Sequence, residues 1–165
     1  MTVSATTISR HKDAGVTLVE VLVILAILSV VTGMAALALP SGPRPATLRQ
    51  QADLLAARLD IAAEESLVSG RAARLEWDTG GYRFTAREGG EWAPHRNPNL
   101  AGPHRLEGMA LRRATGGQTG ALILRPDLGP PDGAVAALDL RAVEARNNYR
   151  VTVLFDGASA RVDAR

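Results

Sequence analysis

The sequence has no cysteine, one lysine and six aromatic residues among its 165 residues. The lack of cysteine excludes disulfide bonds, thiol catalysis and cysteine-ligated zinc. Since Lys12 is the only lysine, the chain that follows it also lacks the lysine of a phosphate-binding loop. The serine-hydrolase and zinc-protease motifs are absent too. We therefore expect a protein without enzymatic activity, bound metal or cofactor.

The charged residues nearly balance, with 19 basic and 17 acidic side chains and a net charge of +2. The isoelectric point of about 9.6 follows from the use of arginine in place of lysine, because arginine stays charged to very high pH. The arginines are spread along the chain and mixed with acidic residues, so the composition does not favour a nucleic-acid partner.

A long apolar segment covers residues 16–39, where 19 of 24 residues are Ala, Val, Ile, Leu or Met. A helix of this length spans roughly 36 Å, which is enough to cross a bilayer core of about 30 Å. Arg10 and Lys12 precede the segment, and the positive-inside rule places the short N-terminus in the cytoplasm. The segment is predicted to be a single transmembrane helix.

Three interpretations of this segment differ in how they account for Glu20. A secretory signal peptide has a shorter apolar region, into which a glutamate does not fit. A simple membrane anchor explains the length of the segment, but a charge on Glu20 would cost about 2.5–3.5 kcal/mol at mid-membrane. The third interpretation gives Glu20 a function.

The sequence around Glu20 resembles the class III signal of type IV prepilins and secretion pseudopilins. Gly15 stands five residues before Glu20, and an uninterrupted apolar run over residues 21–28 follows. The resemblance implies that a prepilin peptidase cuts after Gly15 on the cytoplasmic face, and that Val16 becomes the N-methylated first residue. Glu20 would then be the fifth residue of the mature chain. Val16 departs from the Phe or Met that is usual at its position.

A physical argument gives Glu20 a role in assembly. Cleavage leaves a charged amine on Val16, at the start of an apolar helix. In a bundle of such helices, the amine of one subunit could pair with Glu20 of another, and a register that leaves either charge unpaired would be penalised. We therefore expect Glu20 to select the assembled register.

The chain after residue 39 is predicted to bend and then to fold as an α+β domain. Three prolines within residues 40–45 disfavour a continuous helix. Apolar residues at intervals of three to four predict a helix over residues 46–69, with Gly70 just past its end. Alternating apolar residues predict strands at residues 73–77, 82–86, 106–112, 121–124, 149–155 and 158–164, the last two forming an edge hairpin around Asp156-Gly157.

Three groups of side chains suggest chemistry, and each has a simpler structural interpretation. The Glu64-Glu65 pair lacks an identifiable facing partner and is interpreted as a solvated helix face. His95 and His104 flank a proline-rich surface loop and are interpreted as solvated, because two histidines are a weak metal signal. Asp127 and Asp132 lie in a loop that lacks the spacing of a calcium-binding EF-hand.

The aromatic residues Trp77, Tyr82, Phe84 and Trp92 lie close together in the sequence. One interpretation is a base-stacking platform of the kind that single-strand binders use. A sheet face packed on the 46–69 helix is the favoured interpretation, because these aromatics are expected to share the apolar face.

The soluble part resembles the family shared by pseudopilin H of the type II secretion system and the minor pilin FimT. The resemblance lies in the Ala-, Leu- and Arg-rich helix within residues 48–74, in Gly81-Tyr82-Arg83-Phe84 and in Gly90-Glu91-Trp92. It implies a pilin-like α+β fold made of a cleaved leader (1–15), a transmembrane stem helix (16–39), a proline-rich bend (40–45) and a periplasmic domain (46–165).

The same resemblance implies a minor pseudopilin of the bacterial inner membrane, which joins the pseudopilus at or near its tip and helps to export folded proteins across the outer membrane. The implied partners are the major pseudopilin, the other minor pseudopilins, the prepilin peptidase and the inner-membrane assembly platform.

Two alternative functions remain. The first is a membrane-anchored β domain without a role in assembly. The other is a DNA-binding minor pilin that serves uptake, which would need a basic stripe on the soluble domain. The candidates for that stripe are Arg141, Arg146, Arg150, Arg161 and Arg165, and their acidic neighbours Asp139, Glu144, Asp156 and Asp163 argue against it.

Overall fold

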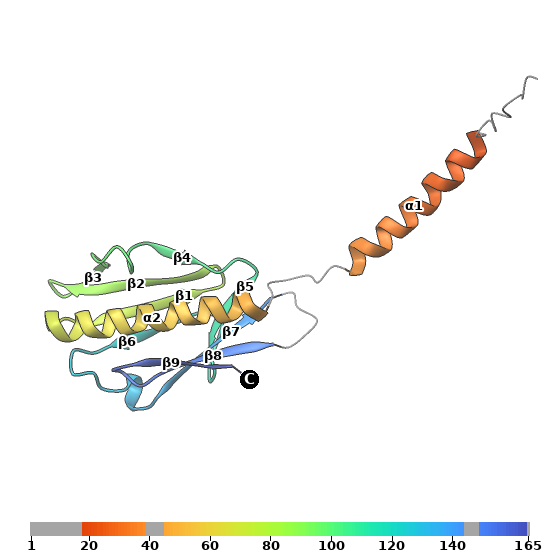
Figure 1. Ribbon diagram of the computed structural model, residues 1–165. Coiled ribbons are helices and arrows are strands. Elements are labelled where there is room, and N and C mark those ends of the chain that lie inside the picture. The colour runs from red at the N-terminus through yellow and green to blue at the C-terminus, as the bar shows by residue number, and fades with distance from the viewer. Residues whose placement is uncertain (1–17, 39–44, 144–148, 165) are drawn as a thin grey trace, which may run out of the picture. The chain divides into compact units, whose positions relative to one another are not determined.

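The computed structural model describes residues 18–38, 45–143 and 149–164, which belong to two compact units, residues 1–40 and residues 41–165. The predicted leader (1–15), including Gly15, lies outside the described residues, as do Val16 and the predicted bend up to residue 44. Figure 1 shows helix α1 in the first unit, and helix α2 with the strands in the second.

Helix α1 (Leu18–Ala38) is almost entirely apolar, and its side chains over residues 18–34 are exposed. The hydroxyls of Ser29 and Thr32 donate to the carbonyls of Leu25 and Leu28 at 2.7 Å, so both polar groups are satisfied within the helix. No helix among the described residues combines the length and hydropathy that crossing a membrane requires. The predicted span of residues 16–39 extends beyond the described residues at both ends.

Helix α2 (Pro45–Ser69) begins the second unit and confirms the helix predicted at 46–69. Proline suits its first turn, because the missing N–H would have no partner there. Gly70 adopts a φ of +67° just past the helix, a conformation that glycine reaches without steric cost. The buried residues recur every three to four positions: Leu48, Ala52, Leu55, Ala56, Leu59, Ala62, Ala63 and Ser66.

Five strands form an antiparallel sheet, sheet A, in the order β3-β2-β1-β6, and β4 also pairs with β2. The predicted first hairpin is confirmed, and Asp78 stabilises its turn by accepting hydrogen bonds from the N–H groups of Gly80 (2.7 Å) and Gly81 (3.1 Å). The strands are β1 (Ala73–Asp78), β2 (Gly81–Glu88), β3 (Glu91–Pro94), β4 (Pro103–Arg105) and β6 (Gly120–Leu124).

Four strands form a second antiparallel sheet, sheet B, in the order β5-β7-β8-β9. The predicted C-terminal edge hairpin is confirmed: Asp156 accepts hydrogen bonds from the N–H groups of Ala158 (2.9 Å) and Ser159 (2.8 Å) at its turn. The strands are β5 (Met109–Arg113), β7 (Ala136–Ala142), β8 (Arg150–Phe155) and β9 (Ala160–Ala164), and the 3-10 turn η1 (Pro131–Gly133) precedes β7.

Helix α2 contacts strands of both sheets, and its buried face joins their inner faces in one hydrophobic core (Figure 1). Phe84 of sheet A and Phe155 of sheet B are the largest fully buried side chains of that core. Every buried apolar residue that the structure describes belongs to the second unit. The predicted fold class is therefore confirmed: an N-terminal helix precedes a helix that packs on antiparallel sheets.

The strand predictions need correction at several points: β4 was not predicted, and the strand expected at residues 158–164 begins at Ala160. The strand expected at residues 106–112 begins only at Met109, because residues 106–108 form a turn in which the Met109 N–H donates to the carbonyl of Leu106 at 3.2 Å. The sequence pattern also missed β7, an inner strand of sheet B that pairs with both β5 and β8. Its sequence alternates between apolar and polar residues around Asp139, but Leu138, Asp139 and Leu140 are buried in succession.

Candidate functional site

The N-terminal motif is described only from Leu18 onward. Glu20 lies in the first turn of α1 and is exposed. A carboxylate at this end of a helix interacts favourably with the helix dipole. Gly15 and Val16, the predicted cleavage and methylation sites, lie outside the described residues.

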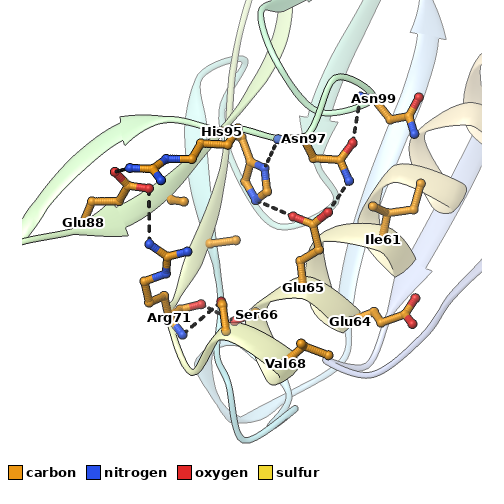
Figure 2. Close-up of a pocket in the computed structure, with 14 residues that line it drawn as sticks. Ile61, Glu64, Glu65, Ser66, Val68, Arg71, Glu88, His95, Asn97 and Asn99 are labelled. Atoms are coloured by element: carbon orange, nitrogen blue, oxygen red, sulfur yellow. Dashed lines mark hydrogen bonds and ion pairs between the residues drawn. The ribbon is translucent and has the colours of Figure 1, made fainter.

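A polar groove of about 540 Å³ lies beside the C-terminal half of α2 in the second unit (Figure 2). One wall is α2, where Ile61 and Val68 flank Glu64 and Glu65. The opposite wall comes from the end of β2 and from the loop after β3, which contribute Glu88, His95, Arg96, Asn97 and Asn99. Acidic and basic side chains therefore face each other across the groove.

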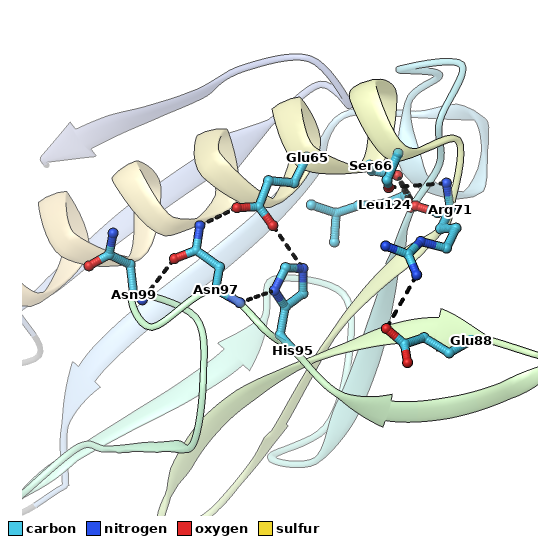
Figure 3. A network of polar contacts seen from close by, with 9 residues as sticks. Glu65, Ser66, Arg71, Glu88, His95, Asn97, Asn99 and Leu124 are labelled. Atoms are coloured by element: carbon cyan, nitrogen blue, oxygen red, sulfur yellow. Dashed lines mark hydrogen bonds and ion pairs between the residues drawn. The ribbon is translucent and has the colours of Figure 1, made fainter.

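Glu65 joins the loop after β3 to α2 (Figure 3). Its carboxylate accepts a hydrogen bond from the side-chain amide of Asn97, and its Oε2 lies 3.6 Å from Nε2 of His95. The Asn97 backbone N–H donates to Nδ1 of His95 at 3.3 Å. Because Nδ1 is an acceptor, the proton of the neutral imidazole lies on Nε2, toward Glu65.

Burial lowers the pKa of His95, which is only 8% exposed. Arg71 also lowers this pKa, whereas the charges of Glu65 and Glu88 raise it. The prediction that His95 is solvated is therefore wrong. The Glu64-Glu65 prediction is correct for Glu64, which is exposed, and wrong for Glu65, which binds the loop.

Three further charged side chains of the groove pair with one another. Arg71 donates to Glu88 at 3.3 Å, and Arg96 donates to the same carboxylate at 2.8 Å. Across the described residues, no group of three His, Cys, Asp or Glu side chains could hold a metal ion. The groove thus presents paired charges that tie the loop, β2 and α2 together.

His104 is also more enclosed than predicted. It lies in β4, its ring is 5.0 Å from that of Tyr82, and its Nε2 is buried without a hydrogen-bond partner. Burial lowers its pKa, and the charge of Arg58 acts in the same direction. Arg58 itself donates to the hydroxyl of Tyr82 at 2.6 Å, so α2 also holds β2 through a polar contact.

The aromatic residues divide between the two faces of sheet A. Trp77, Tyr82 and Phe84 are buried in the core, as predicted. Trp92 does not share that face. It pairs with Arg87 across β2 and β3, and the guanidinium groups of Arg74 and Arg87 lie 4.4 and 5.5 Å from its ring. These distances fit cation–π contacts on the outer face.

The two aspartates considered as calcium ligands are engaged within the fold. Asp127 accepts a hydrogen bond from Arg125 at 2.9 Å, and Asp132 accepts one from Arg113 at 2.7 Å. The carboxylates of this loop are therefore paired with arginines in the structure.

The candidate basic stripe of the DNA-binding alternative is partly neutralised. Asp139, which is 4% exposed, accepts hydrogen bonds from Arg141 at 3.1 Å and Thr152 at 2.8 Å, and Arg150 lies 4.0 Å from it. Arg146, Glu144 and Arg165 lie outside the described residues.

Comparisons with known proteins find a sequence motif at the N-terminus and a similar solved structure. Residues 10–36 match the prokaryotic N-terminal methylation motif. The chain is similar in structure to the minor pseudopilin EpsH from the type 2 secretion system of Vibrio cholerae, with a TM-score of 0.58 and 18% sequence identity over 71% of this chain and 96% of that one. No curated protein matches the chain significantly in sequence. The chain thus carries an N-terminal methylation motif ahead of an α+β domain with the fold of a minor pseudopilin.

Proposed function

We propose that this chain is a minor pseudopilin, a structural subunit of a type II secretion pseudopilus and not an enzyme. The observation that carries the proposal is the occurrence, in one chain, of the methylation motif at residues 10–36 and the fold of a minor pseudopilin. In this role residues 16–39 anchor the newly made subunit in the inner membrane, and the domain of residues 46–165 lies in the periplasm.

Processing is the first step of the proposed function. The prepilin peptidase cuts between Gly15 and Val16, and the new amine of Val16 is methylated. Intact-mass measurement of the chain from its native host should show the loss of residues 1–15 and the added mass of one methyl group. Gly15→Ala should leave the full-length, unmethylated chain, since the cut requires the small glycine before it. Normal processing of this variant would contradict the assignment.

Glu20 acts at the next step, when the subunit enters the filament. Its carboxylate pairs with the methylated amine of a neighbouring subunit in an apolar surrounding, where an unpaired charge is costly. Glu20→Leu should be processed normally but should fail to cross-link to the other pseudopilins and should abolish secretion. Glu20→Asp, which keeps the charge, should retain part of the activity. Wild-type assembly of Glu20→Leu would remove this role.

Partners and position follow from the same proposal. The subunit assembles at or near the pseudopilus tip with the other minor pseudopilins, and the major pseudopilin forms the shaft. Co-purification of the tagged chain from its native host should recover the other minor pseudopilins. Recovery of type IV pilus subunits in their place, together with salt-dependent DNA binding by residues 46–165, would favour the DNA-uptake function.

A further inference from the structure

Strand β6 ends sheet A with an uncharged edge. In the described part of the chain its only strand partner is β1. The 3-10 turn η1 lies close to β6, yet no backbone hydrogen bond joins the two among the described residues. Gly120 and Ala121 are exposed, and Ile123 is 48% exposed. The edge therefore offers backbone donors and acceptors beside accessible apolar side chains.

The other sheet edges of the described chain carry the residues that normally prevent edge pairing. Proteins protect such edges with charge and with proline, because an unpaired strand is a template for another strand. Prolines and arginine protect the side of sheet A formed by β3 and β4, and β5 and β9 of sheet B contain arginines. By contrast, residues 114–124 contain neither a charged residue nor a proline. The lack of protection is thus specific to β6.

We propose that β6 pairs in antiparallel orientation with β6 of a second copy of this chain. A two-fold axis at Leu122 places Ala121 opposite Ile123 of the partner subunit, and the same pair recurs on the other side of the axis. A small side chain then faces a large one on the outer face, and neither of the two is charged. The two copies of sheet A join into one continuous sheet. This inference goes beyond the proposed function and does not rest on it.

The absence of native cysteine allows a clean cross-linking test on the full chain in detergent. Residues directly opposite in an antiparallel pair have Cβ atoms about 4.5–5.5 Å apart, whereas diagonal neighbours lie about 7–8 Å apart. A disulfide joins Cβ atoms about 3.5–4.5 Å apart, a separation that opposite residues can reach with a small shift and diagonal neighbours cannot. A mixture of Ala121→Cys and Ile123→Cys chains should therefore form disulfide dimers several-fold faster than either variant alone. A mixture of Ala121→Cys with Arg161→Cys, on the edge strand β9, is the matched control.

A charge at the edge provides a second readout. Ile123→Lys should abolish dimer formation of the cysteine-free chain in sedimentation experiments, while Ile123→Thr should retain it, and the two variants should unfold at similar urea concentrations. The proposal is overturned if the 121/123 mixture cross-links no faster than the β9 control, or if Ile123→Lys dimerises like the native chain.

Discussion

At the scale of single residues, burial favours the neutral form of the two histidines of the second unit. His95 accepts a hydrogen bond at Nδ1, and His104 has its Nε2 buried. Burial lowers the pKa of both below the value near 6.5 that histidine has in an unfolded chain. The unfolded state consequently binds more protons than the folded state when the pH falls below about 6.5.

This difference predicts that the second unit loses stability in mild acid. The histidine contribution is fully present above pH 6.5 and is lost as the pH falls through the lowered folded-state pKa values. The urea midpoint of residues 41–165 should therefore drop between pH 7.5 and pH 5.5. The His95→Gln/His104→Gln double variant should show a smaller drop. Asp156, whose pKa is lowered from 3.8 by backbone hydrogen bonds, titrates below this window and does not confound it.

A second prediction at the scale of residues concerns the stability effect of substituting Gly120. A Cβ at this position would lie 2.9 Å from Cε2 of the Trp77 indole, which is closer than side chains pack. Gly120→Ala should lower the free energy of unfolding by about 1–3 kcal/mol, because the indole must shift within a packed core. Gly117→Ala is the matched control, since the nearest atom to its Cβ would be 3.8 Å away. Equal urea midpoints for the two variants would show that Trp77 moves freely.

At the scale of elements, a polar contact ties α2 to the last strand. The carboxylate of Asp60 accepts a hydrogen bond from the backbone N–H of Ala160 at 2.7 Å. Asp60→Ala should destabilise the second unit by about 1 kcal/mol in urea unfolding and should speed amide hydrogen exchange at Ala160. Asp53→Ala, which removes only an exposed pair with Arg49, should cost about 0.5 kcal/mol or less. Slow exchange at Ala160 in the Asp60 variant would contradict this assignment.

The elements also show which parts of the fold could be predicted from sequence patterns. Helix α2 and the hairpins at Asp78 and Asp156 were predictable, because their signals lie within a few neighbouring residues. Trp92 was misplaced because its face depends on its pairing with Arg87 in β2. Strand β7 was missed although Leu138 and Leu140 alternate with Asp139 and Arg141, and the arginines and threonine that satisfy the buried carboxylate come together only in the fold.

The groove beside α2 was unpredictable for a similar reason. Glu65 and Asn97 are 32 residues apart, and neither carries a local signal of the contact. The N-terminal motif is the opposite case, since its glycine and glutamate stand at a fixed short spacing that can be read from the sequence alone.

At the scale of the whole molecule, the two units differ in what stabilises them. The second unit contains all the buried apolar residues that the structure describes, whereas the described side chains of α1 over residues 18–34 are exposed. The isolated segment 41–165 should therefore fold cooperatively, with a urea midpoint matching that of the same unit in the full chain in detergent. A lower midpoint, measured by tryptophan fluorescence, would show that residues 1–40 contribute to the stability of the second unit.

The placement of α2 has a mechanical consequence. It is the first element of the second unit, and its buried face runs against strands of both sheets. A force applied at Pro45 along the axis of α2 would act on this packed face in shear. A chain that entered the domain through an edge strand would instead peel away one hydrogen bond at a time. A pull on the chain from its N-terminal side therefore reaches the core of the second unit through α2 first.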